Sequence, residues 1–166
     1  MNNLINRIKQ VVGIKNTADI SRPISSVLVP VAGFPIDKEA LQVALKVTSS
    51  SHGQVFAVYV AEIPLSLPLN SLPQEDLEKS EKILTELTEY ATSNNRTIET
   101  ELLLTRSRGD TLINESIERE VDLIIMGIQY TKNHGEFELD EAVNNLLQNS
   151  PKSVWILRES TQGTIS

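Results

Sequence analysis

The sequence predicts a three-layer, doubly wound α/β domain around a parallel sheet, and three observations support that fold class. Short β-branched runs alternate with amphipathic helical segments from residue 25 to residue 158. The run VDLIIMG at 121–127 has no polar alternation, which is typical of a strand covered on both faces. The chain has 166 residues and 40% hydrophobic content, enough for one domain with a proper core.

The first part of the domain is predicted as strand, helix and strand. SSVLVPV at 25–31 is the first strand, and the turn that follows it contains Gly33. DKEALQVALKVTSS at 37–50 has its apolar residues near helical spacing, and GQVFAVYVAE at 53–62 is the second strand. A right-handed crossover through the helix makes the two strands parallel.

The connection IPLSLPLNSLP at 63–73 is long and apolar for a loop. Its three prolines forbid a regular helix, and its leucines need cover that a free loop does not have. We expect this connection to fold over its own domain. The alternative is a docking surface for another protein or for a dimer partner.

The rest of the domain continues the alternation of helices and strands. The predicted elements are a helix at 74–95 with an acidic start, a strand at 97–104, a helix at 109–120, the strand at 121–127, a helix at 140–149 and a last strand at 153–157. Five strands joined by right-handed crossovers give the doubly wound sheet.

Charge divides the chain into an arm at 1–23, a domain at 24–159 and a tail at 160–166. The arm has four basic residues and one Asp, which gives it a net charge of +3. Because the whole chain has a net charge of −7, the rest of it has −10. Its apolar residues share a helical face, flanked by positive side chains: Leu4, Ile5, Ile8, Val11 and Val12, with Arg7, Lys9 and Lys15. Such a helix can contact an anionic membrane through residues 1–15. Packing on the domain and remaining mobile are the alternatives.

Composition excludes several classes of function. The chain has no cysteine, which removes disulfides, thiolate chemistry and cysteine-rich zinc sites. An acidic domain lacks the clustered Lys and Arg that nucleic-acid binding needs, so no nucleic-acid partner is expected. The arm has neither a secretory cleavage pattern nor the length of a membrane span. We therefore expect a cytoplasmic protein, with membrane association through the arm as an option.

Four stretches together resemble the universal stress protein family over residues 25–158. They are VLVPVAG with ALQVALKV, GQVFAVYVAE, RGDTLINESIEREVDLIIMG and LLQNSPKSVWILR. The resemblance implies an adenine-nucleotide alpha hydrolase-like fold with a five-stranded parallel sheet of order 3-2-1-4-5. It also implies a homodimer through the fifth strand, whose apolar residues are Val154, Trp155, Ile156 and Leu157. Trp155 is expected to fill the core or the seam between subunits.

In that strand order a crevice opens at the carboxyl ends of the first and fourth strands, where the sheet reverses direction. Any small ligand is expected there. The residues expected to line the crevice are Val31, Ala32, Gly33, Met126, Gly127, Gln129, Tyr130, Asp140 and Glu141.

ATP-binding relatives share a Gly-x-x-Gly, nine-residue spacer, Gly-Ser/Thr pattern and an Asp after the first strand. Gly127 matches the first Gly of the pattern, but Tyr130 stands at the second Gly and Asp140 at the third. Glu141 stands at the Ser/Thr position, and Ala32 replaces the Asp after the first strand. Carboxylates at the start of the last helix occupy the place where amides and the helix dipole would attract an anion. The plainer role of Asp140 is that of a helix N-cap. Both roles disfavour phosphate.

These departures predict a non-enzymatic regulatory or interaction module that holds no cofactor. The alternative is a sensor of an adenine nucleotide such as ATP, AMP or a cyclic dinucleotide, with contacts from Gln129 and Arg106. The phrase VAEIPLSLPL is similar to the second-strand ending of family domains that work with membrane transporters, which makes a transporter a candidate partner for 63–73.

No catalytic or metal residues are predicted. His134, Asp140 and a serine lack the Gly-x-Ser-x-Gly turn that a nucleophile needs. His134, Glu136, Glu138 and Asp140 alternate and offer ligand atoms to a divalent cation, but an acidic surface loop is usually just solvated.

Overall fold

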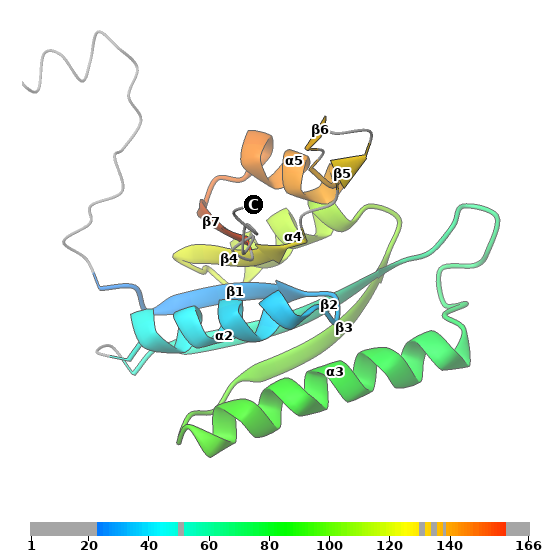
Figure 1. Ribbon diagram of the computed structural model, residues 1–166. Helices are drawn as coiled ribbons and strands as arrows, with labels where there is room; N and C mark the ends of the chain where they lie inside the picture. Colours follow the sequence, from blue (N-terminus) through cyan, green and yellow to red (C-terminus); the bar gives the residue numbers. More distant parts are fainter. Residues whose placement is uncertain (1–22, 50–51, 130–131, 134–135, 138, 159–166) are drawn as a thin grey trace, which may run out of the picture.

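A computed structural model describes residues 23–49, 52–129, 132–133, 136–137 and 139–158 of the chain. Five parallel strands form the central sheet in the order β3-β2-β1-β4-β7, which confirms the predicted fold class and the order that the resemblance implied (Figure 1). The strands are β1 (Ser26–Val31), β2 (Gln54–Glu62), β3 (Glu99–Thr105), β4 (Leu123–Ile128) and β7 (Ser153–Arg158). The sequence therefore placed each strand of this sheet to within two residues at either end.

Two layers of helices cover the sheet (Figure 1). The helices are α2 (Pro35–Val47), α3 (Gln74–Ser93), α4 (Arg108–Glu118) and α5 (Glu141–Asn149). Side chains of β1 alternate between the two layers, so that Val27 and Val29 pack with α2 and α3, whereas Leu28 packs with Leu112 of α4 and Leu146 of α5. Full burial of each such side chain contributes about 1.5–3 kcal/mol. This double coverage explains why the inner strands are continuously apolar.

A short antiparallel hairpin, absent from the sequence prediction, lies between β4 and α5. It pairs β5 (Lys132–Asn133) with β6 (Glu136–Phe137). Two-residue strands carry too little periodicity for a sequence pattern to reveal them. Figure 1 shows the hairpin beside α5, at the edge of the molecule where β4 ends.

The connection between β2 and α3 was expected to fold over the domain, and for three of its four leucines this expectation is wrong, whereas Leu72 is half-buried. Ile63 is buried at 3% exposure, but Leu65 is 89% exposed and Leu67 and Leu69 are 44% and 46% exposed. In Figure 1 the connection stands out beyond the ends of the strands. Prolines at three positions and a polar clamp described below keep it from folding back.

The arm hypothesis falls on residues 1–22, and those residues lie outside the described part of the chain. The tail at 160–166 lies outside it too. Among the helices of the described ranges, none combines the length and apolar character that crossing a membrane requires.

Candidate functional site

A cavity of about 260 Å³ lies at the carboxyl ends of β1 and β4, the place where the sheet reverses direction. Its walls come from β1, β2, β4, the start of α4 and the start of α5. Six of the residues expected in the crevice line it: Val31, Ala32, Met126, Gly127, Gln129 and Asp140. The other lining residues are mainly apolar, and they include Phe34, Tyr59, Val60, Leu112 and Val143.

Two of the expected residues are placed differently, and a third lies outside the described residues. Gly33 has a φ of 92°, and a Cβ there would lie 2.6 Å from Cδ1 of Ile83, so it faces α3 instead of the crevice. Glu141 lines a neighbouring cavity. Tyr130 lies outside the described residues.

Asp37 holds the loop that follows β1, and the sequence analysis missed it. Its Oδ2 accepts hydrogen bonds from the backbone N–H groups of Ala32, Gly33 and Phe34, at 2.8, 2.7 and 3.0 Å. Consecutive amides that converge in this way form an anion-binding nest, and here the bound anion is a side chain of the same chain. The signal was an acidic residue in the first turn of a helix, where it can bond back to the N-cap amide.

The Asp37 side chain is only 3% exposed, and this burial is the largest influence on its pKa. Desolvation raises the pKa of this carboxyl above its usual value, and the three amide hydrogen bonds oppose that rise. The carboxylate is therefore held in place at some electrostatic cost, inside the wall of the crevice.

Asp140 is the N-cap of α5, where its Oδ1 accepts from the N–H of Ala142 at 2.8 Å. Its Oδ2 lies 2.5 Å from Nη2 of Arg108, the first residue of α4. The guanidinium is also 3.9 Å from Glu62. The sequence revealed only the carboxylates at this helix start. It did not reveal the Arg108 guanidinium, because a partner 32 residues away cannot be recognised from local spacing.

A second, polar cavity of about 230 Å³ adjoins the crevice between the starts of α4 and α5. Glu62, Ser107, Glu141 and Asn145 are among its lining residues. Arg108 and Asp140 line both cavities, so their ion pair stands at the boundary between the apolar crevice and the polar space. The ionisable groups in the crevice wall, two carboxylates and one guanidinium, have a net charge of −1 when ionised.

Gly127, the one position that matches the phosphate pattern, has a packing reason to be glycine. A Cβ there would lie 2.7 Å from Cγ2 of Ile36 and 3.1 Å from its carbonyl oxygen. The first of these distances is shorter than real Cβ atoms approach a neighbour, so a side chain at position 127 would force Ile36, at the start of α2, to shift. The residue matches the pattern without requiring a ligand.

Arg106 was the alternative nucleotide contact, and the structure engages it elsewhere. Its guanidinium donates to the carbonyl oxygens of Ile63 at 2.8 Å, Leu67 at 2.6 Å and Pro64. These three carbonyls accept three of the five N–H donors of the guanidinium, and Arg106 also lines the polar cavity that adjoins the crevice. Arg106 is a clamp on the connection after β2.

Within the described ranges, no group of three or more His, Asp or Glu side chains is placed so that it could hold a metal ion. His134, which was considered for both the triad and the cation site, lies outside the described residues, and so does Glu138 of the cation site.

The predicted dimer strand, β7, pairs with β4 on one side and has no second neighbour among the described strands. Trp155 on it is 42% exposed, so it does not fill the core. Val154 and Leu157 pack against the two core clusters of their own domain. Of the four predicted interface residues, Trp155 is therefore the one most available to a second molecule.

Comparison with known proteins places the chain in a family. The model of the universal stress protein family matches residues 23–158, and no curated protein matches the sequence. Similar solved structures include a universal stress protein from Archaeoglobus fulgidus, with a TM-score of 0.68 and 15% identity over 80% of this chain and 97% of that one.

Two further structures were solved with nucleotides. The Archaeoglobus fulgidus protein in complex with dAMP has a TM-score of 0.65 and 14% identity, over 81% of this chain and 98% of that one. An Arabidopsis thaliana family protein with AMP bound has a TM-score of 0.57 and 15% identity, over 86% and 97%. At such identities the likeness shows the fold. The family match over most of the sequence shows more: this chain belongs to the universal stress protein family.

Proposed function

We propose that the protein is a non-catalytic regulatory module that does not hold a nucleoside triphosphate in the glycine-rich manner of its ATP-binding relatives. One observation carries the proposal. Backbone amides at both loops of the crevice are bonded to the chain's own carboxylates, Asp37 after β1 and Asp140 at the start of α5.

A phosphate group would have to displace these carboxylates. Removing three amide donors from the buried Asp37 leaves polar groups without partners, which costs about 1–3 kcal/mol for each group. At α5, two unit charges about 4 Å apart repel by about 1 kcal/mol in water and about 4 kcal/mol at an effective dielectric constant of 20. Arg108 offsets part of that repulsion, but it already pairs with Asp140.

The proposal is tested by isothermal titration of the full chain with ATP and magnesium. We expect no binding in the low-micromolar range. Low-micromolar binding that is weakened by Ala32→Trp, a substitution at a half-buried residue of the crevice wall, would overturn the proposal. The matched control is Leu147→Trp on the exposed face of α5, at 50% exposure, which leaves the crevice unchanged.

Regulation without a bound triphosphate requires protein contacts, and two surfaces favour them. The free edge of β7 with its exposed Trp155 suits a second copy of the chain, because unprotected edges pair. The exposed leucines of 63–73 suit a further protein, for which a membrane transporter is the class that the sequence resemblance suggests.

A second candidate is a sensor of a nucleotide with a single phosphate. The Arg108 guanidinium at the mouth of an otherwise apolar crevice favours it, and the relatives solved with dAMP and AMP support it. The cavity is smaller than the about 300–1,000 Å³ typical of drug-sized ligands, which favours a small molecule over a triphosphate. Titration with AMP beside ATP separates the two candidates, since only the sensor binds AMP.

A further inference from the structure

One carboxylate in the wall of the crevice has no cationic partner. Asp37 lines the crevice and is 3% exposed, so water covers little of its charge. Among the ion pairs that the described residues form, none includes Asp37. Buried charges in proteins are normally paired with an opposite charge. The place of that opposite charge is therefore open beside Asp37.

The two oxygens of the Asp37 carboxylate are in different situations. Oδ2 accepts from the N–H groups of Ala32, Gly33 and Phe34, which uses its acceptor capacity. Oδ1 has no hydrogen-bond partner among the described residues. In the same part of the chain, Ser26 Oγ is the one fully enclosed side-chain oxygen or nitrogen without a partner, so Oδ1 is not enclosed. Oδ1 therefore meets the space of the crevice, which Asp37 lines.

The other charged groups of the crevice wall compensate each other. Nη2 of Arg108 lies 2.5 Å from Oδ2 of Asp140. Glu62 adds a second carboxylate, 3.9 Å from Nε of the same guanidinium. The positive charge in the wall is therefore already matched by carboxylates. The charge that remains without compensation is negative and belongs to Asp37.

The surroundings of Asp37 suit an organic cation better than a metal ion. A divalent metal ion takes several ligands at once, and within the described residues no group of three or more acidic or histidine side chains is placed to hold one. The crevice wall instead includes two aromatic residues, Phe34 and Tyr59, and aliphatic residues such as Val60 and Leu112. Aromatic rings attract cations, and aliphatic groups pack against hydrocarbon. A cation with an apolar body fits both parts of the wall.

We propose that the crevice binds a small organic ammonium ion. Its N–H donates to Oδ1 of Asp37, and its hydrocarbon part is buried against the aromatic and aliphatic wall. The ligand is a primary or secondary ammonium, because a quaternary one has no N–H to donate. The cavity of about 260 Å³ is smaller than the about 300–1,000 Å³ of drug-sized sites, so the ligand is compact, with one ring or a short chain. This inference goes beyond the proposed function, which leaves the crevice without a triphosphate, and it is an alternative to a nucleotide with a single phosphate.

The same carboxylate opposes an anion and favours a cation. A phosphate would have to displace Oδ2 of Asp37 from its amides and would then face the negative charge. An ammonium ion displaces nothing, because it uses the oxygen that the amides leave over. The carboxylate is also held in place before binding by its burial and its three hydrogen bonds. A site that is ordered in advance loses little conformational entropy when a ligand binds.

The test titrates the full chain at pH 7 with benzylamine, phenethylamine and cyclohexylmethylamine, all of which are protonated at that pH. Nuclear magnetic resonance follows the amides of Ala32, Gly33 and Phe34, which bond to the same carboxylate. We expect shifts of these resonances that saturate. Benzyl alcohol has nearly the same shape as benzylamine without the charge. It should bind at least about tenfold more weakly, since hydrogen bonds between charged groups are the stronger ones.

Asp37→Asn tests the role of the carboxylate itself. The side-chain oxygen of asparagine can still accept from the three backbone amides, but its NH₂ group then puts a donor where Oδ1 was an acceptor. The affinity for benzylamine should fall at least about tenfold. The matched control is Glu39→Gln, which makes the same change of charge on the same helix, at an exposed side chain that does not line the crevice. Its affinity should change by less than about twofold, because exposed charges interact weakly.

Three results would contradict the inference. The first is the lack of a saturable shift with all three amines at millimolar concentrations. The second is an affinity that is equal for benzyl alcohol or unchanged in Asp37→Asn, because the carboxylate would then not be the partner. The third is tighter binding of neutral adenine, with the same loss in Asp37→Asn, which would mean that Oδ1 recognises the amino group of a nucleobase. The ATP titration is a separate measurement, so this inference and the proposed function fail separately.

Discussion

At the residue scale, the Asp37 carboxylate decides what the loop after β1 can bind. It is buried, and its Oδ2 uses the N–H groups of three successive residues. Arg108 plays the opposite part at the other side of the crevice, where it supplies a positive charge next to Asp140. Both roles depend on contacts that form only when the chain folds, and neither follows from the glycine pattern.

Asp37→Ala should lower the free energy of unfolding by about 1–3 kcal/mol, because three amides lose their acceptor. Asp37→Asn should cost less, since its side-chain oxygen can still accept. Urea unfolding at pH 7 measures both changes. An alanine variant as stable as the parent chain would show that water satisfies these amides equally well.

The raised pKa of Asp37 also predicts a pH dependence. Because the folded state binds the proton more tightly than the unfolded state, the stabilisation linked to protonation is fully present below the ordinary carboxyl pKa. It is lost as the pH rises through the folded-state pKa. The unfolding free energy of the parent chain relative to Asp37→Asn should therefore fall as the pH rises over that window. A difference that is constant with pH would contradict the raised pKa.

At the element scale, the strands and helices could be predicted from the sequence because the spacing of apolar residues and the residues at turns specify them locally. The first strand ends where Gly33 adopts a positive φ, and α2 starts at a proline. The connection after β2 could not be read, since its exposure depends on Arg106, more than 40 residues away from Ile63. Likewise, the sequence placed Asp140 at a helix start but could not reveal the guanidinium that pairs with it.

Removing the Arg106 clamp should loosen the connection at 63–73. In Arg106→Ala, the carbonyls of Ile63, Pro64 and Leu67 lose their shared donor, so amide hydrogen exchange at 65–71 should speed up markedly. Lys82→Ala on the exposed face of α3, where the ion pair with Glu86 is solvated, is the matched control and should change nothing there. Equal exchange in both variants would show that the prolines alone hold the loop.

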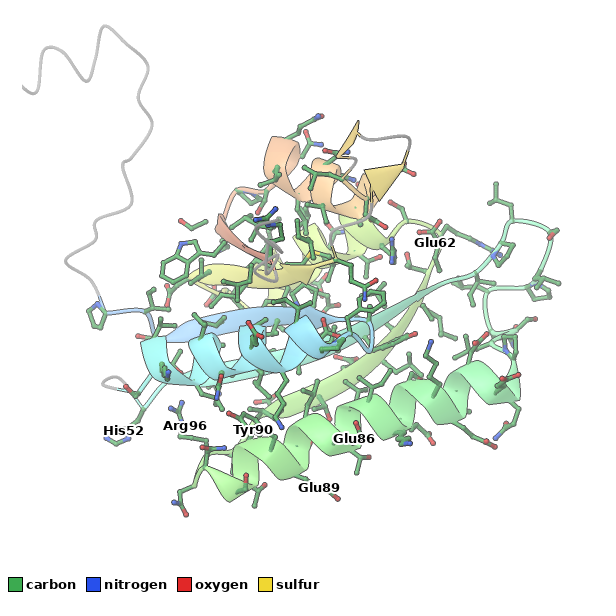
Figure 2. The ribbon with its side chains drawn as sticks, viewed as in Figure 1. His52, Glu62, Glu86, Glu89, Tyr90 and Arg96 are labelled. Atoms are coloured by element: carbon green, nitrogen blue, oxygen red, sulfur yellow. The ribbon has the colours of Figure 1, made fainter. Side chains whose placement is uncertain are left out.

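At the scale of the whole molecule, the family fold is kept, while the function proposed above has the crevice hold no triphosphate. Helices cover both faces of the sheet, whereas among the described residues the edge of β7 has no second strand beside it and Leu65, Leu67 and Leu69 of the 63–73 connection are exposed. In Figure 2 the side chain of Glu89 on α3 points away from the sheet, and Glu86 on the same helix is also exposed.

Trp155→Lys should convert a dimer into monomers, because a charge on the exposed side of β7 opposes pairing of two edges. Light scattering of the full chain at several concentrations measures the mass. Leu147→Lys, at a similarly exposed leucine on α5, should leave the mass unchanged. A parent chain that is already monomeric would contradict the dimer, and so would a Trp155→Lys dimer.

The most direct test of the central claim follows the backbone amides of Ala32, Gly33, Phe34 and Ala142 by nuclear magnetic resonance while ATP and magnesium are added. If Asp37 and Asp140 already satisfy these amides, their resonances will stay where they are through the low-micromolar range. Shifts of these resonances that saturate in that range would mean that phosphate displaces the carboxylates, and the account would be wrong.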